Sequence, residues 1–326
     1  MPWLIFFITT VVIVYSASRL SYYGDKIAEL TSLGKMFVGM LLIAAATSLP
    51  EVITSLSSVY QGTPALAAGN LLGSNGFNMV LLAVVFLIEK GRKTNSSLAL
   101  SQALMGTMSI LLIALVIFFL GARIEWKIGW VGLDSLLIVI VYIISVRLLY
   151  RGKNAGQDKE AQETQVVQRG ELGRVIVMFL IWAVLLIVAT PFMVRSADEI
   201  AQITGLGNTV VGTTLVALVT SLPEMTTTIA AVRLGVSEMA VGNLFGSNMF
   251  NMFAIGLTDI LYIKEPFIPL ISDSFIFIGL SGLVMAVLGV INILLNLQRG
   301  RRSTIITSIL MMLFYILGIV LVMSRG

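Results

Sequence analysis

The sequence has 326 residues, of which 57% are hydrophobic and 12% are charged, and its mean hydropathy is +0.98. Soluble domains carry roughly 25% charged residues, so this chain cannot cover a water-soluble globule and most of its surface must face lipid. Cys and His are both absent, which excludes disulfides, thiolate and haem sites, and Ser–His or Cys–His nucleophiles. The net charge of +4 indicates basic cytoplasmic loops rather than nucleic-acid binding.

Apolar segments of membrane-spanning length recur along the whole chain. A helix needs about 20 mainly apolar residues to cross the hydrocarbon core. Ten such segments are predicted, at residues 2–18, 36–59, 65–88, 97–120, 128–146, 175–194, 209–232, 239–262, 267–296 and 303–323. The first lacks the basic start and the cleavage site of a signal peptide, so we expect it to be a span. The predicted fold is an all-α integral membrane protein with ten transmembrane helices.

Lysine and arginine are unevenly distributed over the connections between these spans. If successive connections alternate between the two sides of the membrane, one side receives sixteen basic residues and the other receives five. The positive-inside rule assigns the richer side to the cytoplasm. The sequence therefore predicts a multi-pass cell-membrane protein with both termini outside. The polar stretch 147–174 falls on the cytoplasmic side and is predicted to be a flexible linker.

The sequence repeats itself after 173 residues. Without a gap, Asp25–Leu82 and Asp198–Ile255 share 28 identical residues over 58 positions. Corresponding spans are five apart, an odd number, so the two copies are expected to enter the membrane from opposite sides. The predicted domains are a first five-helix repeat at 1–149, the linker at 150–172, and a second, inverted five-helix repeat at 173–326. Inverted repeats with interrupted helices are typical of secondary transporters, whose substrate site lies near the membrane midplane.

Two acidic residues, Glu51 and Glu224, fall well inside predicted spans. An ionised side chain at that depth costs several kcal/mol unless it is paired or hydrated. The nearest basic residues lie at span ends, so a bound cation is the partner that would neutralise them. Ser48-x-x-Glu51 and Ser221-x-x-Glu224 also match capping boxes with a proline in the first turn, which predicts a helix break at each serine. Capping alone is the alternative role, but it does not need a carboxylate at membrane depth.

A helix break would also supply backbone oxygens. It is expected to free carbonyls in the turn before it, near Ala44 and Thr47 in the first copy and near Ala217 and Thr220 in the second. Unwound carbonyls and carboxylates suit hard cations, since Ca²⁺ takes about 6–8 oxygen ligands.

The following span of each copy carries glycines beside a polar stripe. Gly69 and Gly73, like Gly242 and Gly246, are predicted to let helices pack closely. The stripe repeats every fourth residue: Asn70, Ser74 and Asn78 in the first copy, and Asn243, Ser247 and Asn251 in the second. Polar side chains at membrane depth need a polar neighbour, so we expect the stripe to face the broken helix. Ligand and packing roles stay open for all six, and for Asn75 and Asn248.

The remaining acidic residues near span ends are predicted to be structural. Asp25 and Asp198 close the first span of each copy and are expected to mark boundaries. Asp134, Asp259 and Asp273 have no counterpart in the other copy, and we expect them at the membrane interface.

The repeated segments Asp25–Leu82 and Asp198–Ile255 resemble the alpha-repeats of the sodium/calcium exchanger branch of the cation/calcium exchanger superfamily. The family pattern is a G-x-[ST]-x-x-[DE]-like turn followed by G-S-N-x-x-[ND], and both motifs occur in both copies. The resemblance covers the whole chain and implies a cation site on the second, third, seventh and eighth spans. Its ligands would be Ala44 (carbonyl), Thr47, Ser48, Glu51, Ser74 and Asn78, with Ala217 (carbonyl), Thr220, Ser221, Glu224, Ser247 and Asn251. Ala46 and Val219 replace a glycine that is common before the Thr-Ser pair, a departure that concerns the turn's backbone.

The implied function is secondary active antiport of Na⁺ for Ca²⁺ by alternating access, electrogenic and without a cofactor. The expected partners are the two ions and membrane lipid, with a functional monomer. The main alternative is a calcium/proton, or other divalent cation, antiporter. A channel would need a continuous wet path, and inverted repeats with broken helices favour alternating access instead. An intramembrane hydrolase would need a zinc site or a Ser or Asp dyad, so no enzymatic activity is expected.

Overall fold

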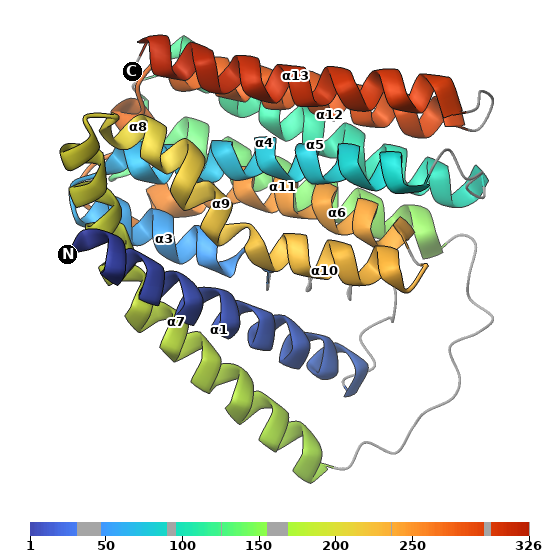
Figure 1. Cartoon of the computed structure of the whole chain (residues 1–326), viewed down its shortest axis with the longest axis horizontal. Helices are drawn as coiled ribbons and strands as arrows, with labels where there is room; N and C mark the ends of the chain where they lie inside the picture. Colours follow the sequence, from blue (N-terminus) through green and yellow to red (C-terminus); the bar gives the residue numbers. More distant parts are fainter. Residues whose placement is uncertain are drawn as a thin grey trace.

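The structure, a computed structural model, describes residues 1–30, 47–89, 96–124, 126–154, 169–235, 237–296 and 301–325. These ranges are almost entirely helical, apart from a short antiparallel hairpin of β1 (Lys127–Ile128) and β2 (Val131–Gly132). The helices run roughly alongside one another, and the two chain ends lie at the same end of the molecule (Figure 1).

The helices of the two sequence halves are as follows. The first half contains α1 (Pro2–Leu30), α3 (Leu49–Tyr60), α4 (Pro64–Glu89), α5 (Ser96–Ala122) and α6 (Leu133–Asn154). The second half contains α7 (Arg169–Thr204), α8 (Gly207–Val211), the π-helical turn η1 (Gly212–Val216), α9 (Ala217–Thr220), α10 (Leu222–Arg233), α11 (Ser237–Leu261), the 3-10 turn η2 (Ile268–Leu270), α12 (Phe275–Asn296) and α13 (Arg301–Arg325).

The described helices agree with a multi-pass membrane protein. Seven of them are long and apolar enough to cross a membrane, and the bent pair Gly207–Thr220 and Leu222–Arg233 makes an eighth if it is one broken span. Residues 36–46, the predicted start of the second span, lie outside the described ranges, as does most of the predicted linker 150–172.

Two helices extend beyond their predicted spans. The span predicted to end at residue 18 continues as α1 to Leu30, and the span predicted at 175–194 is part of the longer α7. α1 and α7 pack against each other. Hydropathy marks the stretch that suits lipid, whereas neighbouring helices decide where a helix ends.

Two other predicted spans begin later than expected. The segments predicted to start at 128 and 267 become helical only at Leu133 and Phe275. Gly129, with φ of +66°, makes the turn of the β-hairpin before α6. Two prolines, Pro266 and Pro269, precede α12, and proline cannot donate the backbone hydrogen bonds of a continuing helix.

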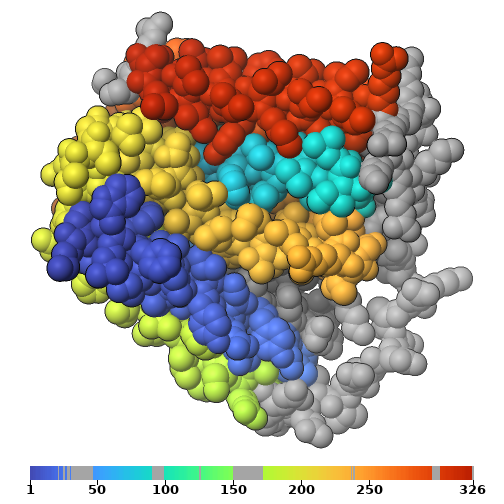
Figure 2. Space-filling view, in the orientation of Figure 1, coloured from blue at the N-terminus to red at the C-terminus, as the bar shows by residue number. Residues whose placement is uncertain are grey.

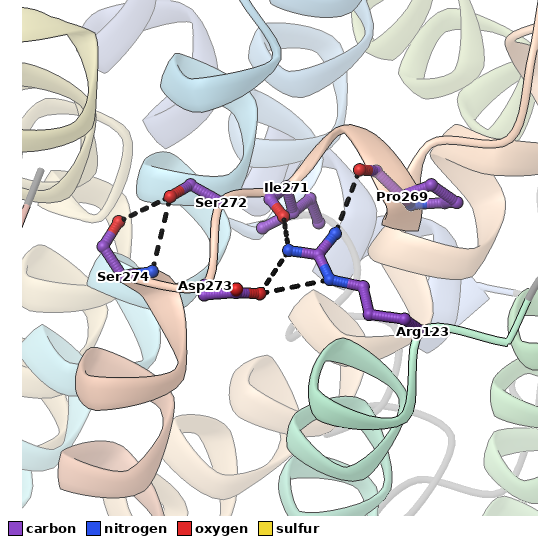
Figure 3. Close-up of polar contacts among 6 residues, drawn as sticks. All are labelled: Arg123, Pro269, Ile271, Ser272, Asp273 and Ser274. Atoms are coloured by element: carbon purple, nitrogen blue, oxygen red, sulfur yellow. Dashed lines mark hydrogen bonds and ion pairs between the residues drawn. The ribbon is translucent and has the colours of Figure 1, made fainter.

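Arg123 ties these two connections together (Figure 3). It directly follows α5, and its guanidinium forms an ion pair with Asp273 and donates to the carbonyls of Pro269 at 3.0 Å and Ile271 at 2.8 Å. The Asp273 side chain is 76% exposed and that of Arg123 38%, so the pair contributes little to stability by itself. The hydrogen bonds of Arg123 instead fix the path of the chain between η2 and α12.

Asp259 connects the same two chain segments in the interior of the protein. Its two carboxylate oxygens accept backbone hydrogen bonds from Gly132, at 2.8 Å, and from Phe267. Asp259 and Asp134 are both buried within the protein, and their position at the membrane interface stays a prediction. The burial of Asp259 follows from the chain on either side of η2 and the β-hairpin, whose N–H groups need buried acceptors.

α4 and α11 form the centre of the molecule. Both are buried over most of their length, whereas α7 and α13 are buried over less than a third. α4 contacts α3, α11, α12, α13 and the α8–η1–α9 segment. Figure 2 shows α1, α10 and α13 on one outer face, with the α8–η1–α9 segment beside them.

The predicted glycine packing is confirmed for the first copy. A methyl group added to Gly69 would lie 2.7 Å from the Thr213 nitrogen, and one added to Gly73 would lie 2.5 Å from the Thr213 oxygen. A methyl group on Gly212 would in turn meet the Leu66 backbone at 2.9 Å. α4 and η1 therefore touch backbone to backbone, which brings the polar stripe of α4 against the broken helix.

Candidate cation site

The TSLPE motif Thr220–Glu224 forms a break between two helical segments, as predicted, and its counterpart Thr47–Glu51 leads into α3, with the residues before Thr47 outside the described ranges. Ser48 precedes α3 with φ/ψ of −89°/7°, and Ser221 separates α9 from α10 with φ/ψ of −88°/5°. In the second copy the two helical segments are bent by 44°. A proline follows in the first turn of each new helix, and Glu51 or Glu224 comes directly after it.

The serines of these breaks do not cap their own helices. Neither hydroxyl makes a capping hydrogen bond, so the capping-box prediction is wrong. Ser48 Oγ donates instead to Glu224 Oε1 at 2.9 Å, and Ser221 Oγ donates to Glu51 Oε1 at 3.1 Å. A hydrogen bond to a carboxylate is roughly twice as strong as one between neutral groups. The two motifs are therefore joined by a reciprocal pair of bonds.

The two glutamates are fully buried and have no basic partner in the part of the chain that the structure describes. Both have no exposed surface, and the second oxygen of each, Oε2, has no hydrogen-bond partner. Within the described ranges the ion pairs are Arg123–Asp273 and Arg195–Glu199, which do not involve either glutamate. Buried carboxylates need compensating charge, which a bound cation could supply here.

Serines of the α4 and α11 stripes reach the same region. Ser74 Oγ lies 3.4 Å from both the Ala217 carbonyl and the Thr220 hydroxyl. Ser247 Oγ donates to Glu224 Oε1 at 3.4 Å. Thr47, next to Ser48 in the first copy, is fully buried as well.

The asparagines one turn further along supply free oxygens. Asn78 and Asn251 are fully buried, and the Oδ1 atom of each has no hydrogen-bond partner in the described part of the chain. Together with the Oε2 atoms of Glu51 and Glu224 they make four buried acceptors without a donor. Carboxylate and amide oxygens are the ligands that Ca²⁺ and other hard cations prefer.

The prediction that the helix break frees the Ala217 carbonyl is wrong. Ala217 O accepts from the Ser221 nitrogen at 3.1 Å and lies within hydrogen-bonding distance of the Thr220 and Ser74 hydroxyls. The last turn of α9 is thus intact, and an ion bound by this carbonyl would replace the hydroxyls. The equivalent carbonyl of Ala44 lies outside the described residues.

Asn70 supports the site through its neighbours. Its Oδ1 accepts from the Thr220 hydroxyl at 2.8 Å, and its Nδ2 donates to the Glu51 carbonyl at 3.0 Å and to Ser55 Oγ at 3.1 Å. Ser55 was not singled out from the sequence, although its position one turn after Glu51 was an available signal. Asn243, the counterpart of Asn70, donates only to Thr227, at 3.3 Å.

Asp198 lies away from the glutamates. It accepts from Gln202 at 2.9 Å and from Asn208 at 2.8 Å, which ties the end of α7 to α8. This agrees with the predicted boundary role. The side chain of Asp25 is outside the described part of the structure.

Comparison with known proteins identifies the family. The profile of the family described as "Sodium/calcium exchanger protein" matches residues 1–151 and 174–324. The chain belongs to the sodium/calcium exchanger family. The inner membrane protein YrbG of Escherichia coli (strain K12) is 30% identical to this exchanger over 247 residues, which are 74% of each chain.

Solved structures of two exchangers share its fold. That of the sodium-calcium exchanger NCX_Mj, soaked with Na⁺, has a TM-score of 0.61 and 23% identity, covering 96% of this chain and 98% of the other. That of the H⁺/Ca²⁺ exchanger CAX has a TM-score of 0.74 and 15% identity, covering 99% and 86%. As a member of the sodium/calcium exchanger family, this protein is an ion exchanger and not an enzyme.

Proposed function

We propose that this exchanger moves Na⁺ against Ca²⁺ across the cell membrane by alternating access. The observation that carries the proposal is the reciprocal pair of bonds from Ser48 to Glu224 and from Ser221 to Glu51. It assembles two buried carboxylates in one place, with no basic partner among the described residues, and such an arrangement suits a divalent cation.

The proposed ligands come equally from both sequence copies. They are Thr47, Ser48, Glu51, Ser74 and Asn78, with Thr220, Ser221, Glu224, Ser247 and Asn251, and the carbonyls of Ala44 and Ala217. Four of their oxygens are buried acceptors without a donor, and the hydroxyls supply further oxygens. Ca²⁺ and Na⁺ would occupy this site in turn, as cargo rather than as a resident cofactor.

We propose further that ten helices form two inverted five-helix repeats, 1–149 and 173–326, joined by the linker 150–172. The sequence repeat, the matching breaks at Ser48 and Ser221, and the reciprocal bonds between the copies support this arrangement. Both termini are proposed to lie outside, as the charge of the loops favours, and they do share one end of the molecule (Figure 1). Because one chain supplies both halves of the site, a monomer is sufficient.

Coupling to Na⁺ is favoured over coupling to H⁺ by the hydroxyls of the breaks. The pairs Thr47-Ser48 and Thr220-Ser221 place hydroxyl oxygens beside the carboxylates, and Na⁺ is held by such neutral oxygens. A proton needs only a carboxylate. The fold is shared with a proton-coupled exchanger as well, so Ca²⁺/H⁺ exchange is the second candidate.

Exchange is proposed to move net charge. Glu51 and Glu224, when ionised, carry two negative charges, which one Ca²⁺ or two Na⁺ would neutralise. The symmetric hydroxyls and amide oxygens exceed what two Na⁺ need, and the family resemblance implies more than two Na⁺ for each Ca²⁺. Exchange of that stoichiometry is electrogenic.

An ion-flux experiment tests the coupling. The purified protein is reconstituted into liposomes, and ⁴⁵Ca²⁺ uptake is driven either by an outward Na⁺ gradient or by a pH gradient in sodium-free buffer. We expect uptake with the Na⁺ gradient and none above the Glu51→Gln control with the pH gradient. Equal uptake under the pH gradient would favour the Ca²⁺/H⁺ alternative.

A further inference from the structure

Two pairs of asparagines link α4 and α11 at the centre of the molecule. Asn78 Nδ2 donates to Asn248 Oδ1 at 3.0 Å, and Asn251 Nδ2 donates to Asn75 Oδ1 at 3.1 Å. The two pairs are equivalent, because Asn248 and Asn251 are the counterparts of Asn75 and Asn78 in the 173-residue repeat. All four side chains are buried. Both bonds have the same polarity: the asparagine of each GSN motif accepts, and the asparagine three residues later in the other copy donates.

This polarity decides which end of the Asn78 and Asn251 amides is left without a hydrogen bond. An asparagine amide carries its oxygen on one side and its NH₂ group on the other, and a rotation of the amide exchanges them. Asn78 turns its NH₂ group toward the oxygen that Asn248 offers, and Asn251 does the same toward the oxygen of Asn75. The oxygens of Asn78 and Asn251 are left as buried acceptors without a partner in the described residues.

The orientation matters because a cation binds oxygens and is repelled by the positive end of an amide. With the NH₂ group turned inward, Asn78 or Asn251 would place N–H dipoles where an oxygen ligand is needed. Groups that orient a metal ligand typically change metal affinity about 10- to 100-fold when they are removed.

We propose that Asn75 and Asn248 are positioning residues of the cation site, which fix the amide oxygens of Asn251 and Asn78 toward the ion without binding it themselves. This inference rests on the proposed function, since it requires a cation beside Glu51 and Glu224. Asn248 is itself held in place, because its Nδ2 lies 3.4 Å from the Asn75 carbonyl and donates to it.

Asn248→Leu removes the accepting oxygen and keeps a side chain of similar size. We expect KM for Ca²⁺ to rise about 10- to 100-fold, because the amide of Asn78 can then turn either way. Asn78→Asp gives that position an oxygen at both ends, so its orientation no longer matters. In the Asn78→Asp background, Asn248→Leu should therefore leave KM nearly unchanged.

Asn251→Asp is the matched control. It adds the same charge to the same site but belongs to the other pair, so it should not rescue Asn248→Leu. It should rescue Asn75→Leu, which Asn78→Asp should not. If only the added charge mattered, Asn78→Asp and Asn251→Asp would each rescue both leucine variants. If the asparagines served packing alone, neither aspartate would rescue them. Either of these two results would overturn the inference.

The readout is ⁴⁵Ca²⁺ uptake into liposomes under a Na⁺ gradient, with the thermal midpoint of each purified variant measured in parallel. Asn75→Leu and Asn248→Leu test the same claim independently, so failure of one variant to fold leaves the other decisive. If the wild-type protein takes up no Ca²⁺, the proposed function fails and the inference falls with it. If the wild type is active and rescue does not follow the pairs, only the inference is wrong.

Discussion

Ser48 and Glu224 are 176 residues apart in the sequence, yet the serine hydroxyl donates a 2.9 Å hydrogen bond to the glutamate carboxylate. Ser221 and Glu51 repeat the relationship in reverse. Each motif thus supplies a carboxylate for the other's serine, and neither sequence copy completes the site alone. This arrangement is the basis for the expectations that follow.

Glu51→Gln or Glu224→Gln should abolish Ca²⁺ transport and leave the protein folded. Each removes one of two buried carboxylates that have no basic partner, so the empty protein should lose no stability. Wild-type protein should gain roughly 2.7 kcal/mol at a Ca²⁺ concentration 100 times its Kd, whereas the variants should not respond. The measurements are ⁴⁵Ca²⁺ uptake and thermal unfolding with and without Ca²⁺.

Asp259→Asn is the control for those variants. Asp259 is an equally buried carboxylate, but its oxygens accept from the backbone of Gly132 and Phe267. An asparagine leaves one of these N–H groups without an acceptor, at a cost of about 1–3 kcal/mol in stability. We expect a lower thermal midpoint and an unchanged KM for Ca²⁺. A changed KM would show that loss of any buried carboxylate disturbs the site.

Ser48→Ala and Ser221→Ala should raise KM for Ca²⁺ to a similar extent. Each loses a hydrogen bond to a charged group, worth about 1.5–3 kcal/mol, which corresponds to roughly 10- to 100-fold in affinity. Ser58→Ala is the matched control, since Ser58 is buried in α3 and its hydroxyl donates to the Thr54 carbonyl of its own helix. An effect of Ser58→Ala as large as that of Ser48→Ala would contradict the assignment.

Gly73→Ala should destabilise the protein and slow transport. The added methyl group would lie 2.5 Å from the Thr213 carbonyl oxygen, and overpacking of this kind costs about 1–3 kcal/mol. Gly282→Ala in α12 is the control, because nothing lies within 4 Å of its added methyl group. Thermal unfolding in detergent should separate the two; equal midpoints would mean that α4 and η1 separate easily.

Membrane voltage should change the exchange rate. If more than two Na⁺ leave for each Ca²⁺ that enters, a potential positive on the Na⁺-rich inside of the vesicle accelerates Ca²⁺ entry. The potential is set with valinomycin and K⁺ gradients in oriented vesicles, and ⁴⁵Ca²⁺ uptake is followed. Rates that do not respond to voltage would indicate two-for-one exchange.

The repeat and the helix breaks could be predicted from the sequence because polar motifs in apolar segments are conspicuous. The partner of each motif could not. Ser48 and Glu51 have the spacing of a capping box, and only the three-dimensional structure shows that Ser48 donates to Glu224 instead. In the same way, helical periodicity places Asn75 on a face of α4 but does not reveal that Asn251 of α11 meets it.

Helix ends were predicted least well, for a related reason. Hydropathy records the length that suits lipid, whereas α1 continues to Leu30 along α7 and α12 starts only after Pro266 and Pro269. The burial of Asp259 follows from the path of the chain around η2, which no local pattern specifies.

Equilibrium binding of ⁴⁵Ca²⁺ to the purified protein, with Na⁺ as competitor, tests the central claim most directly. A single site built by both glutamates predicts one Ca²⁺ per chain, displaced cooperatively by Na⁺, and lost in Glu51→Gln and in Glu224→Gln alike. Asp259→Asn should bind Ca²⁺ as the wild type does. Full Ca²⁺ binding by either glutamate variant, or binding that Na⁺ does not displace, would contradict a shared Na⁺/Ca²⁺ site between the two copies.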